Sequence, residues 1–495
     1  MRLAVLAVPA LLAAACGGGG GHPAAGGAAT RSATATPEAN LTAKIAPARP
    51  GDWNRFGYDA QKTSAAPRGI AASAVGRLHE RRVSLPGTVD ASPIYLAGVT
   101  VGGQRRNVIV VTTTYGRTLA LDAASGSPLW RFQPSSYRRL AGTAQFTTAT
   151  PLSDRRYVYA ASPDGHIHKL RLSDGHQISS GHWPVSVTRD AGHEKIASSL
   201  NLTGGTLLVT TGGYIGDAPP YQGKVVAISA KTGRITAVWN SLCSNRRRII
   251  APSTCGASDS AIWGRAGAVV DPRNHHVYAA SSNGPWNGHT NWGDSTLELS
   301  AGAKRLVGSY TPTNQAELEA QDIDLGSTSP AILPDPASGH PKYLLQGGKD
   351  GLLRLLALPL HAPGRLGGQR QIVTAPGSTD VFTAIAVRHR KGLTEAFVTT
   401  NAGTGAFRLR GGRLHRMWSN GTGGTSPVLA GGVLWVFDPG GALIAYRPGS
   451  GRVIHRFGVP DGHWNSPIVA GGRVYLPTGN ANDHATQGSL SIFSS

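Results

Sequence analysis

Short runs of alternating apolar and polar residues follow one another along most of the chain, with turns rich in glycine, aspartate and asparagine between them. Residues 91–132 show the pattern clearly, as "ASPIYL", "NVIVVTT", "RTLALDAASG" and "SPLWRF". Period-two alternation and many β-branched residues predict strands, and "DAASG" supplies the aspartate and glycine that a tight turn needs. The segment therefore predicts four short strands.

The four-run pattern recurs, and a repeat of this length changes the fold that it predicts. Further copies are expected at 148–172, 206–239, 264–310, 329–357, 382–418, 425–457 and 465–493. The last of the eight units lacks its fourth run, while an unassigned run, "RLHERRVSL" at 77–85, precedes the first. We therefore expect an all-β fold, an eight-bladed β-propeller of four-stranded blades. An N-terminal strand would complete the last blade and close the ring.

The first 48 residues have the composition of a leader and a tether. Residues 1–16, "MRLAVLAVPALLAAAC", predict a signal peptide, because the apolar run is too short to span a membrane. The position of Cys16 resembles the lipobox of bacterial lipoproteins, although leucine lies four residues before the cysteine and not three. This resemblance implies lipidation of Cys16, and plain secretion is the alternative. Residues 17–48 cannot build a core and predict a flexible linker before a propeller domain at 49–495.

These segments predict an extracytoplasmic, membrane-anchored lipoprotein that contacts the membrane through its lipid alone. In that oxidising setting the two remaining cysteines, Cys243 and Cys255, are expected to form a disulfide. No C-x-x-C-H motif is present, so no covalently attached haem is encoded.

The net charge of +21 allows two interpretations. A basic surface favours an anionic wall polymer, phospholipid headgroups or nucleic acid as a partner, and an envelope protein is a further candidate. A composition rich in alanine, glycine and arginine explains the charge without any partner. The longest basic run is "RRR" at 246–248 and no nucleic-acid motif occurs, so we do not expect nucleic acid to bind.

Several motifs together carry a family resemblance. The units share "SP" in the first run, "VY" in the second, "A-L-D-x-x-[ST]-G" in the third and "W" in the fourth, and "DWNRFGYDAQKTSAA" precedes them at 52–66. This pattern resembles the pyrroloquinoline quinone (PQQ) repeat propellers over roughly residues 52–495. The superfamily includes PQQ-dependent alcohol dehydrogenases and cofactor-free propellers such as the lipoprotein of outer-membrane assembly, so the resemblance is specific for fold and much less so for activity.

The resemblance also implies a site. "SAIWGRAGAVVDP" is similar to the segment whose tryptophan lies under the quinone, which makes Trp263 the cofactor platform. "YAASSNGPWN" places Asn283 at a metal ligand, and "QDIDLGSTSP" places Asp322 at the catalytic base and a metal contact. Asp324 would be the additional carboxylate that a lanthanide uses, and Lys349 in "QGGKDG" would contact the quinone oxygens. A hard cation prefers such oxygen ligands, and a nearby carboxylate can accept the alcohol proton.

Two departures from the family pattern weaken that inference. The metal-binding glutamate of the dehydrogenases is missing, and Tyr214 stands in its segment with Asp217 close by. The vicinal cysteine pair that covers the quinone is also missing, because its place reads "AQFTTATP". Each candidate residue has an alternative structural role: Trp263 as core, Asn283 as a turn cap, Asp322 and Asp324 as braces of a loop, and Lys349 as a solvated turn residue.

Two function classes therefore stay open. The first, which we favour, is an exported, lipid-anchored propeller that serves as a cell-envelope binding scaffold or degenerate quinoprotein. The second is a dehydrogenase of alcohols or sugars that depends on PQQ and on Ca²⁺ or a lanthanide. If the chain is an enzyme, we expect a PQQ-dependent, alcohol dehydrogenase-like oxidoreductase; if it is a scaffold, it binds no such cofactor.

Overall fold

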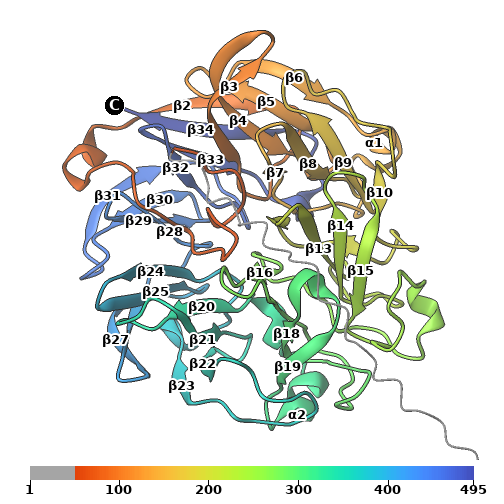
Figure 1. Cartoon of the computed structure of the whole chain (residues 1–495). Coiled ribbons are helices and arrows are strands. Elements are labelled where there is room, and N and C mark those ends of the chain that lie inside the picture. The colour runs from red at the N-terminus through yellow and green to blue at the C-terminus, as the bar shows by residue number, and fades with distance from the viewer. Residues whose placement is uncertain (1–50) are drawn as a thin grey trace, which may run out of the picture. The chain divides into compact units, whose positions relative to one another are not determined.

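Eight β-sheets are arranged around a common axis in the computed structural model, which describes residues 51–495 (Figure 1). The predicted all-β, eight-bladed propeller is confirmed. The predicted signal peptide, Cys16 and the linker 17–48 lie outside the described residues.

Each blade is an antiparallel sheet with its inner strand near the axis, and in blade 7 the added strand β1 (Ala65–Ala66) pairs parallel with β28 (Val428–Ala430). Blade 1 consists of β3 (Ile94–Val101), β4 (Gln104–Thr112), β5 (Thr118–Asp122) and β6 (Pro128–Phe132), and blade 2 of β7 (Leu152–Ser153), β8 (Tyr157–Ala161), β9 (His166–Arg171) and β10 (Val185–Ser186). Blade 3 consists of β11 (Lys195–Ile196), β12 (Asn201–Thr203), β13 (Thr206–Gly212), β14 (Lys224–Ser229) and β15 (Ile235–Asn240). Blade 4 consists of β16 (Val269–Val270), β17 (Val277–Ala280), β18 (Thr296–Leu299) and β19 (Leu306–Tyr310). Blade 5 consists of β20 (Ala331–Pro334), β21 (Pro341–Gln346), β22 (Leu352–Ala357) and β23 (Gln371–Thr374), and blade 6 of β24 (Ala386–Arg390), β25 (Leu393–Thr399), β26 (Thr404–Arg410) and β27 (Arg413–Asn420). Blade 7 consists of β1 (Ala65–Ala66), β28 (Val428–Ala430), β29 (Val433–Asp438), β30 (Ala442–Tyr446) and β31 (Val453–Gly458). Blade 8 consists of β32 (Ile468–Ala470), β33 (Arg473–Thr478), β34 (Gly488–Ser494) and β2 (His79–Leu85).

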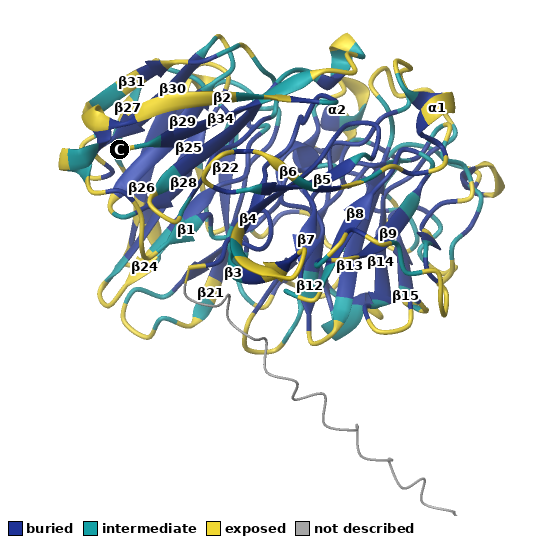
Figure 2. Ribbon diagram, turned by 90° about the horizontal axis from the view of Figure 1, so that it is seen from above, coloured by how far each residue is buried: buried dark blue, intermediate teal, exposed yellow. Residues whose placement is uncertain are grey.

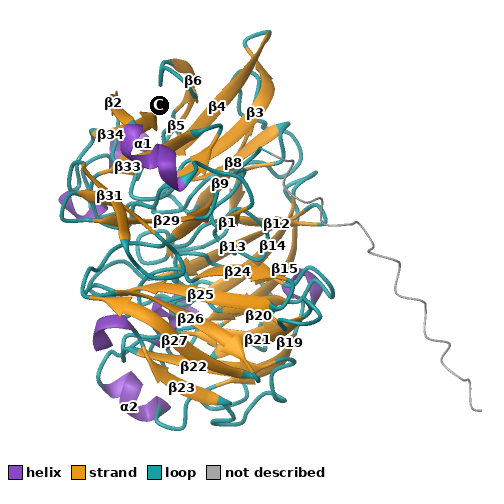
Figure 3. Cartoon of the chain, turned by 90° about the vertical axis from the view of Figure 1, so that its left-hand side faces the viewer, coloured by secondary structure: helices purple, strands orange, loops and turns teal. Residues whose placement is uncertain are grey.

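Short helices occur only in the connections between these strands within residues 51–495. They are α1 (Tyr137–Leu140), α2 (Gln315–Ala320) and single 3-10 turns at Ala72–Arg77, Pro252–Thr254, Ala301–Ala303, Leu325–Ser327, Pro376–Ser378 and Ala481–Asp483. Figure 3 shows α1 and α2 on the same side of the ring. In this part of the chain no helix is long and apolar enough to cross a membrane.

Blade packing explains which runs are fully apolar and which alternate. The middle strands are covered on both faces by neighbouring blades, so Val433–Phe437 of β29 is buried throughout. The outermost strands face solvent on one side, and β2 is exposed along most of its length (Figure 2). Burying one valine or leucine side chain stabilises the fold by about 1.5–3 kcal/mol, so the dense inner strands supply most of the stabilisation.

Blade 8 is completed by the N-terminal strand. β2 pairs antiparallel with β34 from His79–Ser494 to Leu85–Gly488. The sheet order β2-β34-β33-β32 joins the two ends of the ordered chain and leaves no unfinished blade in the ring. Closure of this kind removes the edge that an incomplete sheet would present to other chains.

Residues 52–66 cross one face of the ring and bond to six of the eight blades. Trp53 exchanges two 2.8 Å backbone hydrogen bonds with Tyr95 of blade 1, and Asn54 binds Ser153 of blade 2 through its backbone carbonyl and its side chain. The other partners are Leu200, Asn201 and Leu202 of blade 3, Val270 of blade 4, Val387 of blade 6 and Leu429 of blade 7.

The crossing segment satisfies backbone groups that the blades leave free. The amides of Val270, Val387 and Leu429 lie in innermost strands and donate to carbonyls of Ala60, Thr63 and Ser64 over 3.0, 2.8 and 2.8 Å. Buried backbone donors without a partner are costly, so this segment stabilises several blades at once.

Asn201 is the buried centre of this contact. Its side chain donates to the carbonyls of Ala60 and Ala268 over 2.8 and 2.9 Å, and it accepts a 2.9 Å hydrogen bond from the buried guanidinium of Arg55. The same Arg55 nitrogen also donates to Leu202 O over 2.7 Å.

A disulfide joins Cys243 to Cys255 in the connection between blades 3 and 4. The segment that it closes packs against the loop 281–295, where Cys243 N donates to Asn291 Oδ1 over 3.1 Å and Trp292 Nε1 donates to Ser244 Oγ over 3.0 Å.

Asn201→Ala is expected to destabilise the folded protein by about 3 kcal/mol or more, because it leaves a buried guanidinium and two buried carbonyls with fewer partners. Denaturant unfolding of the purified protein measures the loss. The matched control, Asn401→Ala, removes an exposed asparagine side chain and should change stability by less than about 0.5 kcal/mol. Equal stabilities of the two variants would show that the crossing segment does not brace the ring.

Candidate functional site: an axial chamber

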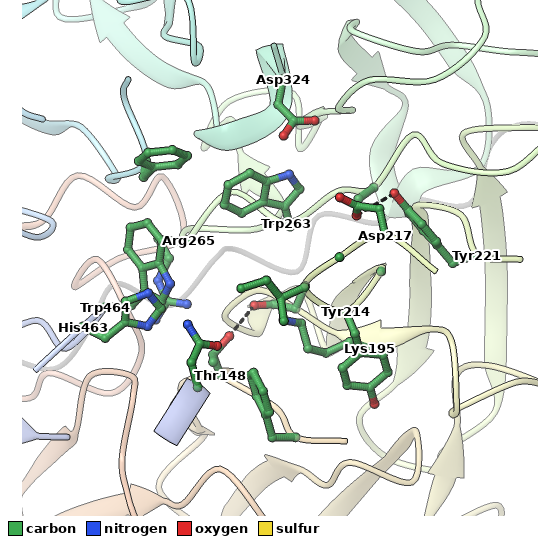
Figure 4. A pocket seen from close by; sticks show the side chains of 18 of the residues that line it. Thr148, Lys195, Tyr214, Asp217, Tyr221, Trp263, Arg265, Asp324, His463 and Trp464 are labelled. Atoms are coloured by element: carbon green, nitrogen blue, oxygen red, sulfur yellow. Dashed lines mark hydrogen bonds between the residues drawn. The ribbon is translucent and has the colours of Figure 1, made fainter. Parts of the chain in front are cut away.

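A cavity of about 310 Å³ lies where the blades converge (Figure 4). Its lining residues come from blades 2, 3, 4, 5, 6 and 8, which places it on the axis of the ring. The loops that line it join the second and third strands of a blade or lead into its first strand, whereas the segment 52–66 bonds to strand ends at the other face. The chamber is lined by Phe146, Thr148, Lys195, Ala197, Gly213, Tyr214, Ile215, Gly216, Asp217, Tyr221, Ala261, Trp263, Arg265, Asn283, Asp324, Lys349, Phe382, His463, Trp464 and Asn482.

The repeat itself determines which side chains reach the chamber. The residue four positions before the innermost strand begins is Thr148, Ala197, Arg265, Phe382 and Trp464 in blades 2, 3, 4, 6 and 8, and all five line the cavity. The residue two positions earlier supplies Phe146, Lys195 and Trp263 in blades 2, 3 and 4. Equivalent repeat positions of different blades therefore place different types of side chain in the same cavity.

Aromatic rings form one wall of the chamber. The ring of Phe382 lies 5.9 Å from that of Trp263 and 5.4 Å from that of Trp464, measured between centroids. Such tilted and edge-on pairs are favourable arrangements of aromatic quadrupoles. The three residues come from blades 6, 4 and 8, so the wall is a product of ring closure.

Two cations lie in the chamber without a carboxylate partner among the described residues. Lys195 Nζ lies 4.9 Å from the ring centre of Phe146 and 5.7 Å from that of Tyr214. Burial and then the nearby charge of Arg265 lower the pKa of Lys195 to about 8. Arg265 is only 3% exposed, donates a 3.1 Å hydrogen bond to the carbonyl of Asp90, and leaves its buried Nε unpaired.

The carboxylate closest to Arg265 is occupied by other donors. Asp90 accepts hydrogen bonds from His463 Nδ1 and Trp464 N, both over 2.7 Å, and from Ala481 N over 3.0 Å. Although burial opposes its ionisation, the contact with His463 lowers the pKa of Asp90. Asp90 therefore orients His463 and Trp464 through its carboxylate and accepts from Arg265 through its backbone carbonyl. Burial lowers the pKa of Arg265, and the nearby charge of Asp90 opposes that shift.

Four residues predicted from the sequence line the chamber together: Trp263, Asn283, Asp324 and Lys349. Asp322 does not line it, and its side chain is 59% exposed. The carboxylate of Asp322 reaches the chamber only through Lys349 Nζ, which lies 3.3 Å from its Oδ1. The role of catalytic base stays a prediction, and this exposed position does not favour it.

Both carboxylate oxygens of Asp324 already have protein partners. Its Oδ2 lies 2.6 Å from Lys349 Nζ, and its Oδ1 accepts a 2.9 Å hydrogen bond from Asn283 N. Although burial opposes the charge on Lys349, the carboxylate of Asp324 raises its pKa above the ordinary value. The 2.6 Å contact therefore has the geometry of a close ion pair.

These residues do not fit a catalytic metal ion. A hard divalent or trivalent cation needs several oxygen ligands, and here it would compete with the ammonium group of Lys349 for Asp324. Within residues 51–495, no cluster of three or more aspartate, glutamate, histidine or cysteine side chains is placed to hold a metal. Asn283 and Asp324 meet as predicted, but they meet as partners in a protein hydrogen-bond network.

Both departures noted in the sequence map to the chamber, where Phe146 and Thr148 of "AQFTTATP" line it in place of the cysteine pair. Tyr214 lines it where the dehydrogenase pattern has glutamate, and its hydroxyl donates to the carbonyl of Ala191 over 3.0 Å. Asp217, the possible substitute, accepts a 2.8 Å hydrogen bond from the buried Tyr221 hydroxyl. Tyr214 has no carboxylate, and Asp217 Oδ1 already accepts from a protein donor.

The loop 281–295 has a packing role beyond Asn283. Trp292 is buried, and Trp286 packs on the same core cluster. Asp294 is fully buried, and its Oδ1 accepts a 3.0 Å hydrogen bond from Leu325 N of blade 5. Burial raises the pKa of Asp294 to about 8. Through this hydrogen bond from Leu325, the loop of blade 4 contacts the segment of blade 5 that contains Asp324.

Sequence reasoning missed the cationic and aromatic half of the chamber: Lys195, Arg265, Phe146, Phe382, His463 and Trp464. Aligning the eight units on their first strands would have found most of them, because they share two repeat positions. The family motifs assign roles to Asn283, Asp322 and Lys349, which do not lie at these two repeat positions.

Together the fold and the family comparison define a PQQ-repeat β-propeller. The family model described as outer membrane protein assembly factor BamB matches residues 74–285 and 396–489, which is more than half of the chain. The chain belongs to this family. No curated protein matches the chain.

Solved structures agree on the fold. The quinohemoprotein alcohol dehydrogenase from Comamonas testosteroni has a TM-score of 0.66 and 15% identity, over 92% of this chain and 81% of that one. The quinohemoprotein alcohol dehydrogenase ADHIIG from Pseudomonas putida HK5 has a TM-score of 0.68 and 15% identity, over 90% of this chain and 80% of that one. A europium-containing methanol dehydrogenase has a TM-score of 0.65 and 15% identity, over 90% of this chain and 98% of that one. At this identity the likeness concerns the fold alone.

Lys349→Met should destabilise the protein at neutral pH by about 2–4 kcal/mol, because Asp324 would then be a buried carboxylate without its cation. The pKa of Asp324 is already raised by burial. Its protonated form is therefore favoured in the folded state, and the deficit should grow as the pH rises from 5 to 8. Unfolding curves at both pH values measure this, and the added change Asp324→Asn should recover most of the loss. A deficit that is independent of pH would contradict the ion pair.

Proposed function

We propose that this protein is an exported, lipid-anchored binding propeller of the cell envelope, and that it does not act as a metal-dependent quinone dehydrogenase. It has the axial chamber of the quinoprotein fold with a different set of charged groups inside. The observation that carries this proposal is the ion pair between Asp324 and Lys349, which occupies the carboxylate that a metal would need.

The position of Asp322 and the identity of Tyr214 support the same proposal. A general base must reach the proton that it accepts, and Asp322 lies outside the chamber lining. Tyr214 adds a phenol that is hydrogen-bonded to a backbone carbonyl where a metal ligand would be needed.

The envelope location rests on the leader sequence and on the family. The predicted signal peptide and the lipidation of Cys16 would place the propeller outside the cytoplasm, tethered to a membrane by lipid. The family description names an outer membrane assembly factor, which supports an envelope protein as one class of partner. The net charge of +21 suits an anionic partner, whether protein or polymer.

Reconstitution tests the proposal. The purified mature protein is mixed with PQQ and either Ca²⁺ or La³⁺, and electron transfer from short alcohols and sugars to a dye is measured beside a known quinoprotein alcohol dehydrogenase. We expect no dye reduction that depends on both metal and substrate. We also expect that Tyr214→Glu, which restores a carboxylate at the missing position, increases La³⁺ affinity.

The dehydrogenase alternative has one observation in its favour, since Trp263, Asn283, Asp324 and Lys349 do share the chamber. Dye reduction by the wild-type protein that is abolished by EDTA and by Asp324→Ala would establish that alternative and end the scaffold proposal.

A further inference from the structure

Blade 6 concentrates positive charge on one face of its sheet. From Ala386 to Asn420 the chain has seven lysine and arginine residues and two histidines, but Glu395 is its single acidic residue. The pairing register places Glu395 opposite both Arg388 and Arg408, and Arg408 opposite His415. Side chains that are directly opposite in a sheet, or two residues apart along a strand, share a face. The residues that join this face by that rule are Arg390, Arg410 and Arg413.

The single carboxylate of blade 6 already has protein partners. Glu395 is 1% exposed, its Oε2 accepts a 2.8 Å hydrogen bond from Arg388 Nε, and its Oε1 accepts a 2.9 Å hydrogen bond from Arg408. It does not reach the two hairpin tips of the blade. The exposed cations at these tips, which we call the basic hairpins, form no ion pair with a carboxylate of residues 51–495; they are Arg390, Lys391, Arg410 and Arg413.

Turn chemistry explains why blade 6 needs no acidic residue at its outer tip. In blade 1 the turn after β5 is held by Asp122, whose Oδ1 accepts hydrogen bonds from two backbone amides over 3.0 and 2.9 Å. In blade 6 the turn Arg410–Arg413 has two central glycines with φ of 58° and 69°. A two-residue hairpin turn of this kind requires positive φ and no side-chain cap, so basic residues can flank it on both sides.

The exposed charges of the ring are divided unevenly between its two faces. On the face where the chamber lies, exposed arginines are mixed with exposed acidic residues, which are Asp217, Glu317, Asp322, Asp461 and Asp483. The opposite face consists of the turns that join the first strand to the second, and the third to the fourth, in each blade. We call it the basic face. Figure 2 shows its exposed turns beside β24 and β21, on the side of the ring away from α1 and α2.

Cations are in excess on the basic face. Three of its aspartates, Asp122, Asp174 and Asp335, lie 3.8, 2.7 and 2.8 Å from the nitrogen of a neighbouring cation. Beside the basic hairpins, the exposed arginines of this face that have no ion-pair partner in the described part of the chain are Arg156, Arg234, Arg273, Arg305, Arg447 and Arg452. They come from blades 2, 3, 4 and 7, so the excess charge surrounds the axis.

We propose that the basic face docks on an anionic phospholipid surface, with the basic hairpins of blade 6 as the main contact and the chamber turned away from the membrane. The inference rests on the proposed function, because it takes the propeller to be tethered to a membrane. It adds a contact that the protein surface itself makes, beyond the predicted lipid on Cys16.

Charge and shape favour a lipid surface as the partner. Arginine binds phosphate groups in a planar, two-point geometry, and each lysine or arginine close to an anionic membrane adds to the attraction. A soluble polyanion would be bound best by cations that line one groove. Here they lie at turn tips of five blades, which suits a broad anionic plane.

The position of the N-terminal segment supports the same orientation. Trp53 exchanges hydrogen bonds with Tyr95 on the basic face, so the described chain begins on this side of the ring. A lipid attached before this point would hold the basic face, and not the chamber face, against the membrane. One lipid and one basic surface together anchor a protein more firmly than either does alone.

Vesicle binding of the unlipidated full chain tests the proposal. All proteins have Cys16→Ser, so the leader contributes equally to each and no lipid contributes. Cosedimentation measures binding to mixed phosphatidylglycerol–phosphatidylcholine vesicles, with pure phosphatidylcholine vesicles as the neutral arm and long-chain polyphosphate as a soluble polyanion. The test variant removes the four charges of the basic hairpins, by Arg390→Gln, Lys391→Gln, Arg410→Gln and Arg413→Gln.

The matched control removes four charges from the chamber face. Its exposed positions are changed by Arg138→Gln, Arg139→Gln, Arg247→Gln and Arg248→Gln. The two variants have the same net charge and differ only in the face that has lost it. All eight positions are exposed, so both variants should fold, and their thermal unfolding is compared with that of the parent protein.

We expect the parent protein to bind the anionic vesicles and not the neutral ones. The test variant should bind at least about 50-fold more weakly, because each cation near an anionic surface contributes about fivefold, whereas the control should bind within about fivefold of the parent. Raising the salt from about 0.1 M to about 1 M shortens the screening length from about 10 Å to about 3 Å and should release the protein. Hydrogen exchange should slow at residues 391–392 and 411–412 on vesicles and stay unchanged at residues 213–220.

Three results would overturn the inference. These are equal binding to anionic and neutral vesicles, equal losses of binding in the test and control variants, or tight binding of polyphosphate without binding of vesicles. Failure of the proposed function is a separate result. Dye reduction that depends on PQQ and metal would end that function without changing vesicle affinity, and absence of vesicle binding would leave the reconstitution result unchanged.

Discussion

The crossing of residues 52–66 over one face of the ring is the contact on which the rest of the structure depends. The innermost strand of each blade has one edge that faces the axis, where no neighbouring strand of its own sheet can satisfy it. The crossing segment supplies carbonyls to those edges in several blades and inserts the Arg55 and Lys62 side chains beneath blade 3. The same stretch then continues into β2, which completes blade 8. The N-terminal segment therefore both braces the ring and closes it.

A braced ring brings equivalent repeat positions together on the axis. In an isolated blade, the residue four positions before the first strand would lie on a solvated loop. In the closed ring, Thr148, Arg265, Phe382 and Trp464 at this position line one cavity. The charge and polarity of the chamber are thus set by the residue that each blade carries at this repeat position. This explains how one propeller fold can hold a metal and quinone in some proteins and an unpaired cationic pair in this one.

Much of the fold could be predicted from the sequence, because period-two alternation and repeated turns are local signals. The missing fourth run of the last unit and the free run at 77–85 even indicated how the ring closes, and β2 does pair with β34. The contacts of residues 52–66 were not predictable, since Asn54 and Arg55 bind partners far along the chain.

The site was predictable only in part. Trp263, Asn283, Asp324 and Lys349 were found through family motifs and do meet, whereas the pairing of Asp324 with Lys349 depends on side-chain distances that no motif encodes. Lys195 lies outside the quoted motifs, and Arg265 lies within "SAIWGRAGAVVDP" at a position to which the resemblance assigned no role. They acquire their character from burial and from the absence of a nearby free carboxylate in the described chain, and both are tertiary properties.

The proposed function requires that Asp324 stays paired with Lys349 and that the axial chamber holds no metal ion between Asn283 and Asp324. Anomalous diffraction from crystals of the mature protein soaked with europium and PQQ tests it most directly. The account predicts no europium peak beside Asn283 and Asp324 and an intact Asp324–Lys349 ion pair. A europium peak coordinated by those two side chains, with Lys349 displaced, would contradict it.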